Sequence, residues 1–137
     1  GYPTFTTWPA APFSSTHQVQ YYKWLERAWQ GGLRLVVQHA VNNQMICDFL
    51  GNGRIQPIRY PCYDMVAVDR QLVEIYRMQD YIDAQEGGPG RGWFRVVTTP
   101  EQAREVIGAG KMAVVLGIET STLFDCFLHP PDGFTPC

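Results

Sequence analysis

Apolar residues recur at helical spacing in three stretches of the chain. In the first stretch the apolar positions are separated by three, three and four residues: Val19, Tyr22, Leu25 and Trp29. This spacing predicts a helix over 16–30, and the same pattern predicts a longer helix over 64–84. A third helix is predicted over 100–109, because Thr99 is a typical N-cap and Gln102 completes a capping box with it.

Between these helices lie apolar runs without helical spacing. The segments 33–41 and 112–118 are short, rich in β-branched residues and almost continuously apolar, which is typical of strands covered on both faces. A shorter run over 93–97 predicts a third strand. The long connection 42–62 is predicted to contain one helical turn over 44–49. Helices that alternate with strands predict an α/β fold with a parallel sheet and outer helices.

Composition places the chain among globular proteins and excludes two kinds of partner. Of the 137 residues, 45% are hydrophobic and 18% are charged, which predicts a single domain segment over 1–137. The net charge is −2 and the basic residues are scattered, so we expect no nucleic-acid partner. No apolar run approaches the roughly 20 residues of a membrane-spanning helix, so we expect no transmembrane segment. Since the chain begins at Gly1 without a basic and apolar leader, we expect any targeting peptide to lie outside it.

The cysteines do not have the spacing of a structural zinc site: Cys47, Cys62, Cys126 and Cys137. An even number of cysteines is compatible with disulfides in a secreted, periplasmic or extracellular protein. Cys47 and Cys62 bracket the long connection, so we predict a disulfide between them. The same argument is weaker for Cys126 and Cys137. The alternative is four reduced thiols that are buried separately.

One acidic residue, Glu119, ends the apolar strand over 112–118. The carboxyl ends of parallel strands are where α/β folds gather catalytic and binding groups. A carboxylate withdrawn from water must be paired, protonated or bound to a cation. Glu119 is therefore a candidate metal ligand; the alternative is that it pairs with an arginine or caps a loop.

His39 lies near the end of the strand over 33–41 and is the second candidate. An imidazole at this edge is able to bind a metal ion or to transfer a proton, whereas the alternative is a hydrogen-bonded core residue. Asn42 and Asn43, just after it, are predicted to fix the turn that follows the strand. His17 and His129 are assigned no catalytic role.

The order of motifs over 64–119 resembles the membrane (renal) dipeptidase family. The segment DMVAVDRQLVEIYRMQ, the turn VTT, the pair GK and the strand ending GIE follow one another as in that family. The N-terminal part, over 1–43, resembles large exported bacterial proteins that are distantly related to these dipeptidases. The resemblance implies a metal-dependent hydrolase on a (β/α)8 TIM barrel. This chain would then be a partial barrel, an early portion of a larger protein.

The resemblance also implies a site and its cofactor. The glutamate that closes the GIE strand bridges two zinc ions in the family, and the matching position is Glu119. Zinc-bound hydroxide would cleave a peptide or other amide bond of a small substrate. The chain departs from the family after Glu119, where Thr120 and Ser121 replace two glycines, and it lacks the other zinc ligands. The complete protein would hold two zinc ions, while this chain alone would hold at most one weakly bound ion or none.

Two other functions are compatible with the sequence. The chain is able to serve as a non-catalytic structural or interaction protein that keeps the barrel framework. Its partners would then be the remainder of the barrel or other protein chains, which would cover an apolar edge left exposed by an incomplete sheet. A carbohydrate-active barrel is the weakest alternative, because it needs two carboxylates and Asp125 is the only candidate partner of Glu119.

Overall fold

A computed structural model describes residues 22–50 and 61–126. The helices and strands follow one another in the predicted order: α1 (Tyr22–Gln30), β1 (Leu35–Val41), α2 (Gln44–Leu50), α3 (Asp64–Gln85), β2 (Phe94–Val97), α4 (Pro100–Gly108), β3 (Met112–Glu119) and the 3-10 turn η1 (Leu123–Asp125). The start of the helix predicted over 16–30 lies outside the described residues. The predicted turn over 44–49 is the helix α2.

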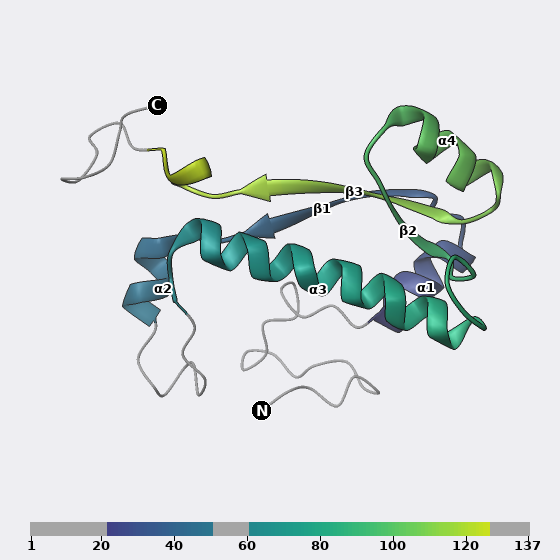
Figure 1. The fold of residues 1–137 in the computed structure, drawn as a ribbon, viewed down its shortest axis with the longest axis horizontal. Coiled ribbons are helices and arrows are strands. Elements are labelled where there is room, and N and C mark those ends of the chain that lie inside the picture. The colour runs from purple at the N-terminus through teal and green to yellow at the C-terminus, as the bar shows by residue number, and fades with distance from the viewer. Residues whose placement is uncertain (1–21, 51–60, 127–137) are drawn as a thin grey trace.

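The described strands form one parallel sheet in the order β1-β3-β2 (Figure 1). Val36 of β1 lies opposite Val114 of β3, and Phe94 of β2 lies opposite Met112 of β3. The predicted parallel pairing of the segments 33–41 and 112–118 is confirmed, and so is the α/β class.

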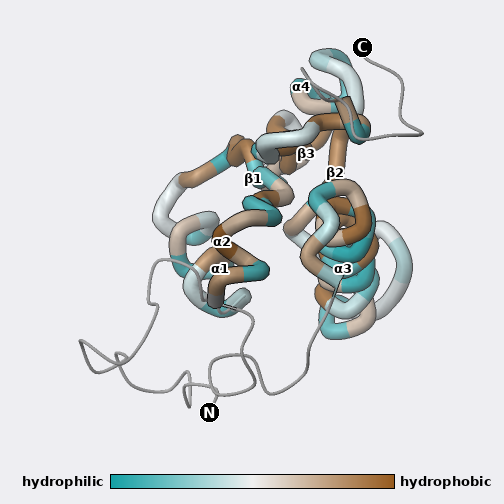
Figure 2. The backbone as a smooth tube through the Cα atoms, turned by 90° about the vertical axis from the view of Figure 1, so that its left-hand side faces the viewer, coloured by the Kyte–Doolittle hydropathy of each residue, from teal (hydrophilic) through white to brown (hydrophobic). Residues whose placement is uncertain are grey.

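The strand order differs from that of the implied barrel. In a (β/α)8 barrel, strands that are consecutive in the chain are neighbours and every helix lies outside. Here the chain passes from β1 to the far strand β2 and then returns to β3 in the middle. Because parallel crossovers are right-handed, this reversal requires α3 and α4 on opposite faces of the sheet, and Figures 1 and 2 show them there. The described strands thus form an open layer between helices, and the partial barrel is not confirmed.

The core lies between the sheet, α1 and α3. Its buried residues come from α3, β2, β3 and the residue before β2: Ile75, Ile82, Trp93, Phe94, Met112 and Val114. Alternate strand residues point to this face, which is why the apolar runs pack tightly here. From α1, the Trp29 ring stacks on Trp93 with 5.5 Å between ring centres, and its Nε1 donates to the Gly110 carbonyl at 2.8 Å. The apolar face predicted for the first helix is therefore used in the core.

The opposite face is only partly covered, by α4. This helix begins as predicted, since the Thr99 Oγ1 accepts a hydrogen bond from the Gln102 N–H at 3.2 Å. In a capping box the Gln102 side chain would accept from the Thr99 N–H. Here its Oε1 accepts from the Thr98 N–H instead, at 2.9 Å. Beyond α4, the β1 side chains of Leu35 and Val37 remain 49% and 59% exposed. The sheet therefore carries an open apolar strip along β1.

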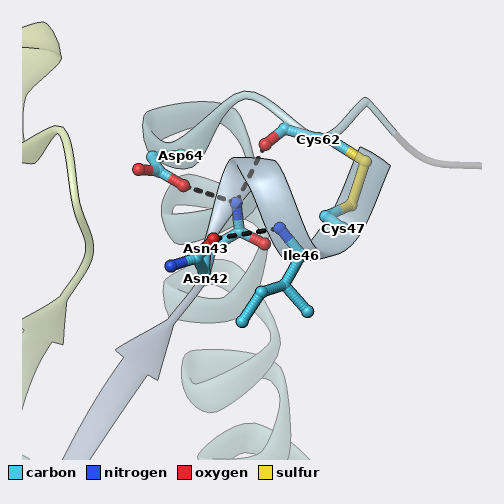
Figure 3. Close-up of a disulfide and its surroundings, with 6 residues drawn as sticks. All are labelled: Asn42, Asn43, Ile46, Cys47, Cys62 and Asp64. Atoms are coloured by element: carbon cyan, nitrogen blue, oxygen red, sulfur yellow. Dashed lines mark hydrogen bonds between the residues drawn. A yellow bond between two sulfur atoms is a disulfide. The ribbon is translucent and has the colours of Figure 1, made fainter. Parts of the chain in front are cut away.

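A disulfide joins Cys47 of α2 to Cys62, just before α3 (Figure 3). The two Cα atoms are 5.5 Å apart, so the predicted pairing is confirmed. Cys126 is also disulfide-bonded, and Cys137, the partner considered for it, lies outside the described residues. No helix in the described part of the chain is long and apolar enough to cross a membrane.

A buried ion pair fixes the C-terminal end of α3 against β2. Both Asp83 carboxylate oxygens accept from the Arg95 guanidinium at 2.7 Å, and the Gly90 and Gly92 N–H groups donate to the same carboxylate at 2.8 and 2.7 Å. Burial alone would raise the pKa of Asp83, but these donors outweigh burial and lower it. A carboxyl whose pKa is lowered by folding stabilises the fold above its unfolded pKa and loses this effect as the pH falls.

We therefore predict that Asp83→Asn lowers the free energy of unfolding by about 3 kcal/mol at neutral pH, because it leaves a partly buried guanidinium without its counter-charge. The difference from wild type should shrink as the pH falls below about 4, because the carboxyl then becomes protonated in the unfolded chain before it does in the folded one. Urea denaturation at several pH values measures it. Asp80→Asn, an exposed carboxylate on the same helix, is the control and should change stability by less than about 0.5 kcal/mol. Equal effects of the two substitutions would contradict the prediction.

Candidate functional site

The two predicted site residues lie on adjacent parallel strands, near the carboxyl edge of the sheet. Glu119 is the last residue of β3 and pairs with Val41, the last residue of β1. His39 lies two residues earlier on β1, opposite Gly117. Side chains alternate along a strand, so His39 and Glu119 point to the same face, away from α3. That face is the one that α4 covers only in part.

The structure brings the two side chains together. The His39 Nδ1 is 3.6 Å from the Glu119 Oε2, and the side chains are 48% and 71% exposed. This separation is longer than that of an ordinary N–H···O hydrogen bond. The pair is therefore close and open to solvent, without being locked in a short hydrogen bond.

Gly117 makes room for this arrangement. A Cβ atom at this position would overlap the His39 Cδ2 and would lie 2.7 Å from its Nε2. The imidazole thus lies directly over the Gly117 backbone, in space that any other residue would fill. A glycine in the middle of a strand usually weakens it, and a close approach of another group is a physical reason for one.

Behind the pair, the buried carboxylate of Asp64 ties the two strand ends to α3. Its Oδ1 accepts from the Asn42 Nδ2 at 2.6 Å (Figure 3), and its Oδ2 accepts from the Thr122 N–H at 3.0 Å and the Thr122 Oγ1 at 2.7 Å. Burial alone would raise the pKa of Asp64, but the hydrogen bonds from Thr122 and Asn42 outweigh burial and lower it. The carboxylate therefore stays charged at neutral pH.

The two donors lie in the turns that follow β1 and β3. Asn42 lies three residues after His39, and Thr122 lies three residues after Glu119. The Asn43 side chain also donates to the Ser121 hydroxyl at 3.2 Å. The predicted role of Asn42 and Asn43 in fixing the turn agrees with these contacts, and the Asn43 Oδ1 accepts from the Ile46 N–H at 3.0 Å. The turns after β1 and β3 are thus held together side by side.

Sequence reasoning missed Asp64. An aspartate in the first turn of a helix is common, since it interacts favourably with the helix dipole, and nothing in its neighbours indicates burial. The sequence does hold one signal for it: polar residues follow both strands. Buried donors in these turns need an acceptor, and one carboxylate is able to serve both turns.

The pair of His39 and Glu119 fits part of a metal site. Zinc binds imidazole nitrogen and carboxylate oxygen at about 2.0–2.2 Å, so two such ligands in a tetrahedral site are about 3.4 Å apart. The observed separation of 3.6 Å is close to this value. Within residues 22–50 and 61–126, however, there is no group of three histidine, cysteine, aspartate or glutamate residues placed to hold an ion. The described residues would therefore supply two ligands at most, one fewer than the protein ligands of a typical catalytic zinc.

The other residues considered from the sequence for the site are Asp125, His17 and His129. Asp125 lies in η1 with a positive φ of 57° and is exposed, and no contact joins it to Glu119 in the described part of the chain. His17 and His129 lie outside the described residues.

Comparison with protein-family models, with curated proteins and with solved structures found no match. Function is therefore inferred from the geometry of the site.

We predict that Gly117→Ala displaces the His39 ring, because the added methyl group would occupy its place. The imidazole signals of His39 in a long-range ¹H–¹⁵N NMR spectrum should shift, while the protein remains folded. Gly108→Ala is the matched control, since a Cβ atom at that position in α4 meets nothing within 4 Å. The control should leave the His39 signals unchanged. Unshifted His39 signals in Gly117→Ala would contradict the placement of the ring over Gly117.

Proposed function

We propose that the chain is part of a metal-dependent hydrolase in which Glu119 and His39 bind a zinc ion. One observation carries the proposal: the His39 nitrogen and the Glu119 oxygen approach to 3.6 Å at the carboxyl ends of neighbouring parallel strands. Two further features support the proposal. Gly117 leaves space for the His39 ring, and Asp64 holds together the turns after β1 and β3, so both keep His39 and Glu119 close to each other.

When bound, zinc would lower the pKa of a water molecule and provide a hydroxide near neutral pH. The role of the chain's own residues is to hold and orient the ion: Glu119 with a charged oxygen and His39 with its Nδ1. The resemblance to the membrane dipeptidases makes a peptide or other amide bond the proposed substrate, and Glu119 the proposed bridge between two ions. Further ligands would come from outside the described residues or from another chain. The proposal does not depend on a closed barrel.

A second candidate function is a non-catalytic interaction protein, and a different observation favours it. The side chains of Leu35, Val37 and Val41 on β1 are about half exposed, on the face that α4 leaves open. Apolar strips on an edge strand are typical of surfaces that bind other chains. The disulfide between Cys47 and Cys62 makes secretion the proposed localisation for either function.

We predict that the full chain binds zinc and that Glu119→Gln and His39→Gln each weaken binding at least tenfold, as loss of one of two ligands requires. Isothermal titration calorimetry measures the affinity. The double variant should lose less binding free energy than the two single losses added together, because both residues serve one ion.

Glu101→Gln is the matched control, since Glu101 is an exposed carboxylate on α4 whose contact is an ion pair with Arg104 at 3.5 Å. It should bind zinc as wild type does. If Glu119→Gln retains the affinity of wild type, the glutamate is not a ligand and the interaction function takes precedence.

A further inference from the structure

The outer edge of β1 carries backbone hydrogen-bonding groups that no other described residue uses. The Arg34 carbonyl accepts from the Ala113 N–H at 2.9 Å, and the Asn42 N–H donates to the Glu119 carbonyl at 3.2 Å. Peptide groups alternate along a strand, so the even positions of β1 face β3 and the odd positions face outward. In the described part of the chain, the outward groups of Leu35, Val37 and His39 make no hydrogen bond.

The outward backbone groups of Val41, the last residue of β1, already have a hydrogen-bond partner. The Gln71 side chain of α3 accepts from the Val41 N–H at 3.0 Å and donates to the Val41 carbonyl at 2.9 Å. A glutamine amide has the same C=O and N–H groups as a peptide bond, so Gln71 pairs with β1 as a residue of a neighbouring strand would. Gln71 thus occupies, at Val41, the place that a peptide group of a neighbouring strand would take.

A groove of about 580 Å³ runs between this edge and α3. Its lining combines residues at the end of β1, among them Gln38, His39 and Asn42, with apolar and polar residues of α3: Ala67, Arg70, Gln71, Glu74, Ile75 and Met78. Strand addition into a groove between an edge strand and a helix is a known mode of peptide recognition, in which backbone hydrogen bonds give affinity and pockets accept alternate side chains.

We propose that this groove binds an extended peptide segment, which adds to the sheet as a strand along β1. Its backbone pairs with Leu35, Val37 and His39, and the Gln71 amide stops the pairing at Val41. Alternate side chains of the peptide lie against Ile75 and Met78 on one face and beside the exposed side chains of Leu35 and Val37 on the other. This inference rests on the groove and not on zinc, so it is tested with the metal removed.

The probe is a fluorescent peptide of alternating threonine and valine with a lysine at each end, titrated into the full chain in EDTA and followed by fluorescence anisotropy. Two N-methylated forms of the peptide test the backbone pairing on the unaltered protein. One carries methyl groups on alternate amides, and the other carries them on the remaining amides. Because only one set of amides faces β1, one form should bind as the parent peptide does and the other should bind at least tenfold more weakly.

A protein variant tests which strand is used. Val37→Pro removes the outward N–H of β1 without removing a bond to β3, and edge strands tolerate proline at such positions. It should raise the Kd about tenfold, as loss of one backbone hydrogen bond would. Val37→Thr keeps the N–H and is the matched control, with a Kd within about twofold of wild type.

Absence of binding by the parent peptide, or equal binding of the two methylated forms, would overturn the proposal. A Val37→Pro variant that is folded by circular dichroism and binds as wild type does would show that the peptide uses another edge, which also overturns it. Since zinc is absent throughout, these outcomes are independent of whether Glu119 and His39 bind metal.

Discussion

The buried carboxylate of Asp64 is the interaction on which the candidate site depends. A charge inside a protein is costly unless donors surround it, and Asp64 receives its donors from the turns after two different strands. The same Asn42 amide also donates to the Cys62 carbonyl at 2.9 Å, next to the disulfide. Moving either turn would leave one oxygen of this buried carboxylate without its side-chain donor. The ends of β1 and β3 are therefore held together by α3, although neither end is packed in the apolar core.

This constraint explains why the open face of the sheet is able to carry a site. On the face toward α3, apolar packing positions the strands. On the other face, α4 covers β2 and β3 only in part, and no helix among the described residues packs over His39 and Glu119. The relative position of the two side chains is set by the pairing of β1 with β3 and by the hydrogen bonds that Asp64 makes on the side of α3. The polar network of Asp64 thus holds the carboxyl edge of the sheet, and the apolar core holds the sheet against α1 and α3.

Local chemistry allowed much of the fold to be predicted. The α4 cap at Thr99, the long helix α3 and the strands β1 and β3 follow from nearby residues, and so does the link between Cys47 and Cys62. The meeting of Glu119 with His39 agrees with a simple rule, that parallel strands bring their carboxyl ends to one edge.

The strand order could not be predicted in the same way. Nothing near β2 indicates that β3 lies between it and β1, because right-handed crossovers allow either order when the helix changes face. Asp64 and the buried pair of Asp83 with Arg95 were missed for a related reason. Arg95 lies 12 residues from Asp83 and Thr122 lies 58 residues from Asp64, and a single carboxylate on a helix has the same local pattern whether it is buried or exposed.

Amide hydrogen exchange at Thr122 tests the role of Asp64 most directly, since this N–H donates to the Asp64 Oδ2 at 3.0 Å. In Asp64→Asn, exchange at Thr122 should become at least tenfold faster than in wild type. Asp69→Asn, an exposed carboxylate on α3, should leave it unchanged. Unaltered exchange at Thr122 in a folded Asp64→Asn variant would contradict the claim that this carboxylate holds the ends of the two strands together.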